Sequence, residues 1–302
     1  MWSKILDLKE CFLQEEPSNE IRLAVRDYAI KNGLDFYDVR NQEGFLRTLM
    51  LRQNSKGEWM VLFQLYREEK ENRENLFNFV LEKFPQIKTL VFAINPKGND
   101  SIYDLDIQNY YGEGFLMEEM DGLQFKIGPK SFFQTNYKQA LESYRKTIEF
   151  AEISENDVVY DLYTGTGTIA QYIAKKAKYV IGIESVQEAI DAAIEHAKLN
   201  GLENCEFHCG DMKDVFTEEF LANHPKADVL ITDPPRDGMH QKVVEQILKL
   251  SPPKIVYVSC NSATQARDLA LMKEHYNVVK ILPVDMFPQT HHVENIALLV
   301  KK

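Results

Sequence analysis

Two side chains in the C-terminal half of the sequence have the chemistry expected of a nucleophile and a base. Cys260 closes the apolar run KIVYVSC and is followed by polar residues. A reactive thiolate needs such a polar, partly exposed position at the start of a helix. Glu294 lies just before a final apolar run, where burial would raise the pKa of its carboxyl group and suit it to act as a general base. Simpler explanations exist for both, because most free cysteines are packed in cores and strand-end carboxylates are often solvated.

A glycine-rich turn, DLYTGTGTIA, provides a candidate cofactor site. Gly165 and Gly167 follow a predicted strand and begin a predicted helix, so backbone amides there can approach a ligand closely. The dinucleotide-binding pattern needs a third glycine, and Ile169 and Ala170 stand in its place. Taken alone, the turn could equally be a tight structural loop, and the residues after the next strands are needed to distinguish the two possibilities.

Acidic residues after the next two predicted strands support a cofactor site. Glu184 follows the glycines by about 20 residues, where a carboxylate could accept both hydroxyls of a ribose. A capping box of Ser185 and Glu188 would explain the start of the next helix and leave Glu184 free. Asp211, in the segment GDM, lies where it could meet the exocyclic amine of adenine. With the third glycine absent, these spacings favour S-adenosylmethionine over NAD.

Two prolines hold Asp233 at the mouth of the fourth predicted strand, in LITDPPRDGM. A pair of prolines after a strand can equally do no more than end the strand and begin a loop. Amine methyltransferases hold their target nitrogen with a similar turn that carries an aromatic residue, and Arg236 stands in its place here, which indicates a different acceptor atom. The adjacent His291 and His292 invite a metal interpretation, but neighbouring side chains point apart on an extended chain. Since no spacing supplies further ligands, we expect no metal site.

These residues need a scaffold that brings strand ends together. From about Glu155 onward, short apolar strands alternate with amphipathic helices, which predicts a doubly wound α/β sheet with its ligand site beyond the carboxyl ends of the strands. Residues 1–125 instead contain a helix ending at Gly33 and two strands joined by a turn at residues 55–57. A helix and a buried strand follow within residues 72–95, so this part is a predicted α+β unit.

Composition sets broader limits on function. The 302-residue chain is 44% hydrophobic and 27% charged, as in soluble globular proteins, and is long enough for two domains. No apolar run reaches the roughly 18 residues of a membrane span, and the charged N-terminus lacks the apolar core of a signal peptide, so we expect a cytoplasmic protein with no membrane partner. Four scattered cysteines argue against a disulfide framework. The formal net charge of −11 argues against broad phosphate binding but leaves room for a local basic groove.

Five motifs, in this order and spacing, resemble those of the RNA uracil-5-methyltransferases: SFFQTN, DLYTGTGT, ITDPPRDG, VSCN and DMFPQTHHVE. The resemblance runs from about Phe125 to the C-terminus. It implies a class I, Rossmann-like methyltransferase catalytic domain with a seven-stranded, doubly wound sheet at residues 126–302. Residues 1–125 would then be a smaller α+β domain that contacts RNA.

The resemblance also implies an activity and a set of site residues. Members transfer a methyl group from S-adenosylmethionine to C5 of a uridine in ribosomal or transfer RNA. Cys260 would attack C6 of the uracil, and Glu294 would remove the C5 proton. The family's cofactor-binding positions fall on Gln134, Tyr163, Thr168, Glu184 and Asp233, and Thr168 stands where some members have asparagine. Gly165, Gly167 and Asp211, expected from the residues themselves, complete the cofactor set. The uridine must leave its stack, and Phe132 or Phe133 could receive it, although we expect core packing for at least one of them.

The N-terminal part departs from the family pattern. Many members begin with a β-barrel RNA-binding domain and three clustered cysteines, which join a later fourth to hold a 4Fe–4S cluster. The segment DLKECFLQ resembles the one with the fourth cysteine. Cys11 would then be an orphan ligand and this chain a truncated piece of a longer enzyme, with a cluster only in the full-length form.

The orphan cysteine also bears on the RNA substrate. Cluster-bearing members are mostly ribosomal, so we expect 23S rRNA ahead of tRNA, with no obligate protein partner. Two alternatives stay open. One is methylation at nitrogen or of a small molecule, for which Cys260 would be dispensable; the other is an idle fragment that only binds cofactor or RNA.

Overall fold

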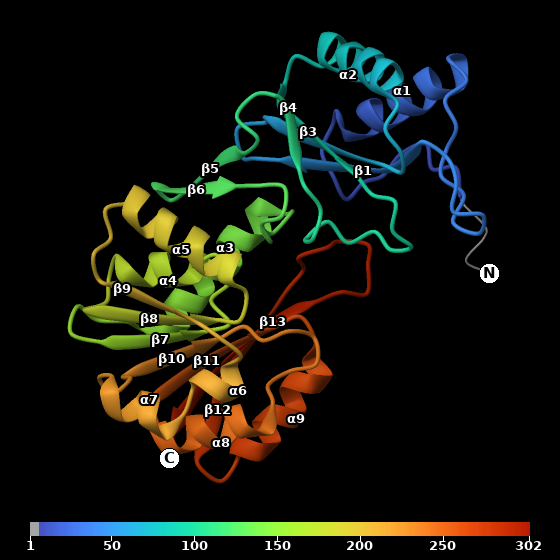
Figure 1. Ribbon diagram of the computed structural model, residues 1–302. Coiled ribbons are helices and arrows are strands. Elements are labelled where there is room, and N and C mark those ends of the chain that lie inside the picture. The colour runs from blue at the N-terminus through green and yellow to red at the C-terminus, as the bar shows by residue number, and fades with distance from the viewer. Residues whose placement is uncertain (1–5) are drawn as a thin grey trace. The chain divides into compact units, whose positions relative to one another are not determined.

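The computed structural model describes residues 6–302, which divide into two compact units (Figure 1). The N-terminal unit comprises residues 6–118 and 126–131, and the C-terminal unit comprises residues 119–125 and 132–302. The paired strands β5 (Leu116–Met120) and β6 (Leu123–Ile127) include two of the three points at which the chain passes between the units, and the third follows Ser131. Among the described residues, no helix combines the length and apolar character needed to cross a membrane.

The N-terminal unit is a four-stranded sheet, of order β1-β2-β3-β4, with two helices. Its elements are α1 (Ser18–Lys31), β1 (Leu46–Gln53), β2 (Trp59–Leu65), α2 (Lys70–Lys83), β3 (Ile87–Ile94) and β4 (Gln108–Tyr111). β1 and β2 form an antiparallel hairpin, and in its turn the Asn54 side chain accepts hydrogen bonds from the N–H groups of Lys56 and Glu58 at 3.1 and 2.9 Å. α1 ends just before Gly33, whose φ of +67° suits glycine best. The predicted helices, hairpin and buried strand are confirmed.

The C-terminal unit is built on a seven-stranded sheet of order β12-β13-β11-β10-β7-β8-β9. Strands β7 to β11 are parallel, whereas β13 runs antiparallel to both β11 and β12. The predicted doubly wound sheet is confirmed. Its elements are α3 (Tyr137–Ala151), β7 (Val158–Leu162), α4 (Thr168–Ala174), β8 (Tyr179–Glu184), α5 (Gln187–Leu199), β9 (Cys205–Cys209), α6 (Met212–Val215), α7 (Glu218–Asn223), β10 (Val229–Thr232), α8 (Gln241–Leu250), β11 (Lys254–Ser259), α9 (Ser262–Met272), β12 (Tyr276–Val284) and β13 (Glu294–Lys301).

Alternate residues of these strands pack on opposite faces of the sheet. In β7, Val159 belongs to one core cluster, whereas Val158 and Tyr160 belong to the other. Side chains of α3 and α4 complete the first cluster, and those of α6, α8 and α9 complete the second. The ribbon shows α3 and α4 on one face of this sheet and α8 and α9 on the other (Figure 1). Burial on both faces explains why the central strands read as continuous apolar runs in the sequence.

The strand order reverses beside β7, which has β8 on one side and β10 on the other. After β7 the chain enters α4 on one face, and after β10 it enters α8 on the opposite face. Such a reversal is where open α/β sheets bind their ligands, beyond the carboxyl ends of the strands. The glycine turn and the DPPRDG segment therefore both leave the sheet at this position.

Candidate active site

Cys260 lies where β11 gives way to α9, and its thiol is half-buried. Asn261 caps the helix, because its side-chain oxygen accepts a hydrogen bond from the N–H of Ala263 at 3.1 Å. Ser259 Oγ donates to the Asn261 carbonyl at 3.0 Å, which fixes the turn. The polar, helix-start setting expected from the sequence is therefore present around Cys260.

Glu294 is the first residue of β13, and the sheet register brings it toward Cys260. β13 runs antiparallel to β11 with Ser259 opposite Asn295. One further step of this register sets Cys260 opposite Glu294. Burial raises the pKa of Glu294, the direction expected from the sequence, while the nearby Arg236 opposes the shift. A carboxylate with a raised pKa is a better proton acceptor near neutral pH.

Asp233 and Arg236 complete a group that we call the Cys260 cluster, namely Cys260, Glu294, Asp233 and Arg236. Burial, followed by the charges of Glu294 and Asp161, raises the pKa of Asp233 to about 8. Burial, then Glu294 and Asp233, also raises the pKa of the Cys260 thiol, whereas Arg236 lowers it. Burial and the neighbouring carboxyl groups therefore disfavour the thiolate in the free protein, and added positive charge nearby would favour it.

The loop that follows β10 is fastened to the start of α9. The carbonyl of Arg236 accepts hydrogen bonds from Asn261 Nδ2 and Thr264 Oγ1, both at 3.0 Å. Both donors belong to the segment that carries Cys260. The two sequence motifs DPPRDG and VSCN are thus joined directly, which holds the nucleophile candidate and Asp233 in a constant relation.

Asp268 anchors the same loop from inside α9. It is fully buried, and its Oδ2 accepts hydrogen bonds from the Met239 N–H at 2.8 Å and from the Tyr257 hydroxyl at 2.7 Å. Arg267 donates to the carbonyl of Asp237 at 2.8 Å. Gly238, with φ of +75°, lies so close that a Cβ there would be 2.7 Å from Asp268 Oδ2. Only glycine fits at this point of the loop.

Sequence reasoning missed the role of Asp268. One signal was available, because Asn261, Thr264 and Asp268 recur at intervals of three and four residues. On a helix this spacing makes one face, and the face that packs on a sheet is normally apolar. A polar stripe in that place indicates bonds to a specific neighbour.

The glycine turn after β7 has the backbone expected of a ligand-binding loop. Tyr163, Gly165 and Gly167 have φ values of +63°, +56° and +75°. A Cβ at Gly167 would lie 2.8 Å from the Cβ of Ala193, so this glycine allows close packing of helices. A Cβ at Gly165 would have no atom within 4 Å, so the chain is open to a ligand on that side.

Glu184 faces the glycine turn, but it is not free. One carboxylate oxygen accepts from the Gly165 N–H at 3.2 Å, and the other accepts from Ser185 Oγ at 2.9 Å and the Val186 N–H at 3.1 Å. α5 begins at Gln187 after Val186, without a side-chain cap. The predicted capping box at Ser185 is therefore wrong, because its hydroxyl bonds Glu184 instead.

Three other predicted cofactor residues lie on different elements of the C-terminal unit. Asp211 caps α6, and hydrogen bonding from Lys213 lowers its pKa, so it is an anion. Thr168 is the first residue of α4 and is buried, with its Oγ1 3.4 Å from that of Thr166. Gln134 is half-buried and lies in the segment just before α3.

The segment that holds Gln134 is tied to the one that leads into β13. Asn136 caps α3 by accepting from the Gln139 N–H at 3.2 Å, and its Nδ2 donates to the carbonyl of Met286 at 3.0 Å. Phe133 packs against the core, as expected for one of the two phenylalanines, whereas Phe132 is 71% exposed. Phe132 is thus available to a partner.

Asp161 is a buried acid that sequence reasoning passed over within DLYTGTGT. Burial raises its pKa to about 7, and Thr164 Oγ1 donates to its Oδ2 at 2.6 Å. Its Oδ1 has no hydrogen-bond partner among the described residues. An aspartate inside an otherwise apolar strand was the available signal. Its hydrogen bond with Thr164 holds the first part of the glycine turn, and its charge helps to raise the pKa of Asp233.

One smaller expectation also needs correction, and the remaining cysteines can be placed. The rings of His291 and His292 do not point apart, since their centroids are 4.1 Å from each other and the chain there is bent. Cys205 and Cys209 both lie on β9, but only Cys205 is partly buried, with its pKa raised by burial to about 12, and Cys209 is exposed. Cys11 is half-buried and exchanges backbone hydrogen bonds with the Asn19 side chain.

Comparison with known proteins agrees with this geometry. Residues 97–302 match the profile of the tRNA (uracil-5-)-methyltransferase family. A relative from Porphyromonas gingivalis, named an uncharacterized RNA methyltransferase, is 52% identical over 100% of this chain, and one of the same name from Bacteroides thetaiotaomicron is 50% identical over 99%. The chain spans 66% of the length of each.

A solved structure is similar over both units. It is the Pyrococcus abyssi tRNA (uracil-54, C5)-methyltransferase in complex with S-adenosyl-L-homocysteine, with a TM-score of 0.82 and 32% identity. The similarity covers 99% of this chain and 71% of that one. The fold is therefore that of a Rossmann-like methyltransferase.

Proposed function

Because the chain belongs to the tRNA (uracil-5-)-methyltransferase family, we propose that it transfers a methyl group from S-adenosylmethionine to C5 of a uridine in RNA. The observation that supports this most is the register of β11 and β13, which sets a half-buried thiol opposite a carboxylate of raised pKa. Methylation of an amine would need neither group.

The residues after β7, β8 and β9 suit S-adenosylmethionine, which would supply an electrophilic methyl group. Gly165 offers an open backbone, Glu184 stands beside it for the ribose hydroxyls, and the anionic Asp211 suits the adenine amine. The remaining proposed contacts are Gln134, Tyr163, Gly167, Thr168 and Asp233. The positive charge of a sulfonium near the Cys260 cluster would lower the pKa of the thiol and of Asp233.

The proposed reaction uses Cys260 and Glu294 in turn. The Cys260 thiolate adds to C6 of the uracil, and the displaced π electrons make C5 a carbon nucleophile. C5 then bonds to the methyl carbon as the carbon–sulfur bond of the sulfonium breaks. Glu294 takes the C5 proton, the C5–C6 double bond forms again, and the thiolate leaves. The uridine has to be flipped out or single-stranded, and the exposed ring of Phe132 offers a stacking surface.

We propose 23S rRNA as the substrate, with tRNA as the alternative. The argument for 23S rRNA is that the segment around Cys11 resembles the corresponding segment of family members that hold a 4Fe–4S cluster, which are mostly enzymes of ribosomal RNA. The argument for tRNA is the activity named for the Pyrococcus structure. Residues 1–125 would contact RNA and residues 126–302 would carry out the transfer, in the cytoplasm.

Methyl transfer to purified RNA tests the proposal. The protein is incubated with methyl-labelled S-adenosylmethionine and either unmodified 23S rRNA or tRNA, and the product is digested to nucleosides. We expect labelled 5-methyluridine from 23S rRNA, no product with Cys260→Ala, and a trapped protein–RNA adduct with Glu294→Gln. Product from tRNA alone would move the substrate to tRNA. Cofactor binding without any transfer would indicate an idle fragment, and full activity of Cys260→Ala would overturn the mechanism.

A further inference from the structure

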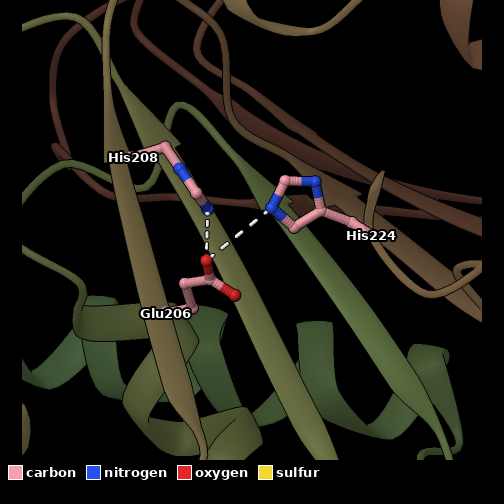
Figure 2. Close-up of side chains that lie close together, drawn as sticks. All are labelled: Glu206, His208 and His224. Atoms are coloured by element: carbon pink, nitrogen blue, oxygen red, sulfur yellow. Dashed lines mark ion pairs between the residues drawn. The ribbon is translucent and has the colours of Figure 1, made fainter. Parts of the chain in front are cut away.

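A second group of chemically capable side chains lies on the edge strand β9 and just beyond α7. Glu206 and His208 are two residues apart on β9, so both project from the same face of the strand. His224 directly follows α7 and points at them (Figure 2). One ligand atom from each of the three lies within 4.8 Å of the other two.

Both imidazoles direct a nitrogen at the same carboxylate oxygen (Figure 2). His208 Nε2 is 3.0 Å and His224 Nε2 is 3.7 Å from Glu206 Oε1. His208 Nε2 is a buried atom that lies at ion-pair distance from Glu206 Oε1, and no geometric hydrogen bond is found for it among the described residues. A buried polar atom of this kind calls for an explanation, such as an ion.

The tautomer of His224 sharpens the problem. Its Nδ1 is 2.7 Å from the carbonyl of Phe220, which can only accept, so Nδ1 carries the proton. In the neutral ring Nε2 then presents a lone pair to the carboxylate of Glu206, which is also an acceptor. Two electron-rich atoms, His224 Nε2 and Glu206 Oε1, thus face each other, and a cation between them would resolve their repulsion.

Neighbouring groups hold these side chains as metal ligands are usually held. Tyr179 donates its hydroxyl proton to Glu206 Oε2 at 2.7 Å, which leaves Oε1 for an ion. The Phe220 carbonyl takes the second N–H of His224, and the Phe220 ring stacks on its imidazole with centroids 3.9 Å apart. Such outer contacts orient ligating histidines and carboxylates in metal sites.

We propose that Glu206, His208 and His224 bind one divalent transition-metal ion, with Zn²⁺ as the best match. Two imidazoles and one carboxylate form a known zinc ligand set, with solvent in the fourth position. Zinc–ligand bonds of about 2.0–2.1 Å in a tetrahedron place ligand atoms about 3.3 Å apart. The two distances to Glu206 Oε1, 3.0 and 3.7 Å, lie on either side of this value.

The site has a structural use in this fold. No residue of α7 is fully buried, and the helix packs on the core through the partly buried Phe220 and Leu221. An ion joined to both β9 and His224 would fix the chain between them, which includes Asp211 at the cap of α6. No local spacing predicts this site, because His224 lies 16 residues beyond His208 along the chain and meets it only when α7 packs beside β9.

Zinc competition with a chromogenic chelator tests the proposal on the chain without a histidine tag. We expect one zinc ion per chain. Outer-shell substitutions cost about 10- to 100-fold in metal affinity, so loss of a ligand in Glu206→Gln or His224→Gln should cost at least about 100-fold. His275→Gln removes an exposed histidine elsewhere and should bind as the unaltered protein does.

Two further readouts keep the outcome clear. Cobalt substitution should give d–d bands without a thiolate charge-transfer band, since a thiolate band would assign the ion to a cysteine instead. Zinc should raise the melting temperature of the unaltered protein and of His275→Gln but not of Glu206→Gln, which can keep the bond to Tyr179. Absence of stoichiometric zinc, or equal affinity in Glu206→Gln, His224→Gln and the unaltered protein, would overturn the proposal.

Discussion

Replacing Asp268 with alanine would leave two buried donors without an acceptor. The Tyr257 hydroxyl and the Met239 N–H both donate to Asp268 Oδ2, and Asp268 and Tyr257 are fully buried. Each unsatisfied buried donor costs about 1–3 kcal/mol, so Asp268→Ala should lower the free energy of unfolding by about 2–6 kcal/mol. The pair with Arg267 adds little, because the Arg267 side chain is 53% exposed.

Tyr257→Phe is the matched control, because it removes one of the two donors and keeps the ring. It should cost about 0.5–1.5 kcal/mol, the usual net contribution of one hydrogen bond. The double variant should cost less than the sum of the single changes, because the hydroxyl no longer needs an acceptor.

Urea unfolding followed by hydrogen exchange measures these costs in the C-terminal unit alone, with peptides from β10, from the loop that contains Met239, from β11 and from α9. Asp268→Ala should also speed exchange at Met239 and reduce methyl transfer, because the loop that holds Arg236 loses its anchor. A cost within 0.5 kcal/mol of that for Tyr257→Phe, with unchanged exchange at Met239, would refute the role assigned to Asp268.

The other predictions concern the turn and the Cys260 cluster. Gly167→Ala should lower stability by about 2–4 kcal/mol, because its Cβ would lie 2.8 Å from a neighbouring alanine Cβ at positive φ. Gly165→Ala should cost only about 1–2 kcal/mol but weaken cofactor binding more; thermal unfolding and calorimetry distinguish the two, and equal losses of stability would contradict the assignment. The pKa of Asp233, raised to about 8, makes the folded state bind more protons than the unfolded state, so stability should fall as pH rises from about 4 to 8. Asp233→Asn should make that fall smaller in cofactor-free protein, with Asp161 and Glu294 responsible for what remains. An equal dependence of the melting temperature on pH in the two proteins would contradict this prediction. Arg236→Ala should slow alkylation of Cys260 at neutral pH, since Arg236 lowers the pKa of that thiol; an unchanged rate, measured by mass spectrometry of the labelled peptide, would remove Arg236 from the cluster.

Local patterns predicted the elements well, because each depends on neighbours along the chain. The alternation of apolar strands and amphipathic helices from Glu155 reflects burial on both faces of one sheet, and the Gly33 stop reflects a backbone conformation that glycine favours. The carboxyl ends of parallel strands also had to share one edge, so Gly165 and Asp233 could be placed at that edge in advance.

Contacts between distant segments could not be predicted in the same way. That Cys260 stands opposite Glu294 depends on β13 entering the sheet antiparallel beside β11, which no local period encodes. The bonds of Asp268 to the preceding loop, and the meeting of Glu206 with His224, likewise arise only when separate elements pack. The capping box at Ser185 failed for a related reason, because Glu184 competed for the same hydroxyl.

The central claim is that Cys260 forms a covalent bond to the uracil ring during transfer. RNA containing 5-fluorouridine tests it, because fluorine at C5 leaves no proton for Glu294 to remove. With S-adenosylmethionine present, we predict a stable protein–RNA adduct, and digestion followed by tandem mass spectrometry should locate a methylated fluorouridine on Cys260. An adduct that persists in Cys260→Ala, or methyl transfer to normal uridine that leaves no adduct with the fluorinated RNA, would contradict the account.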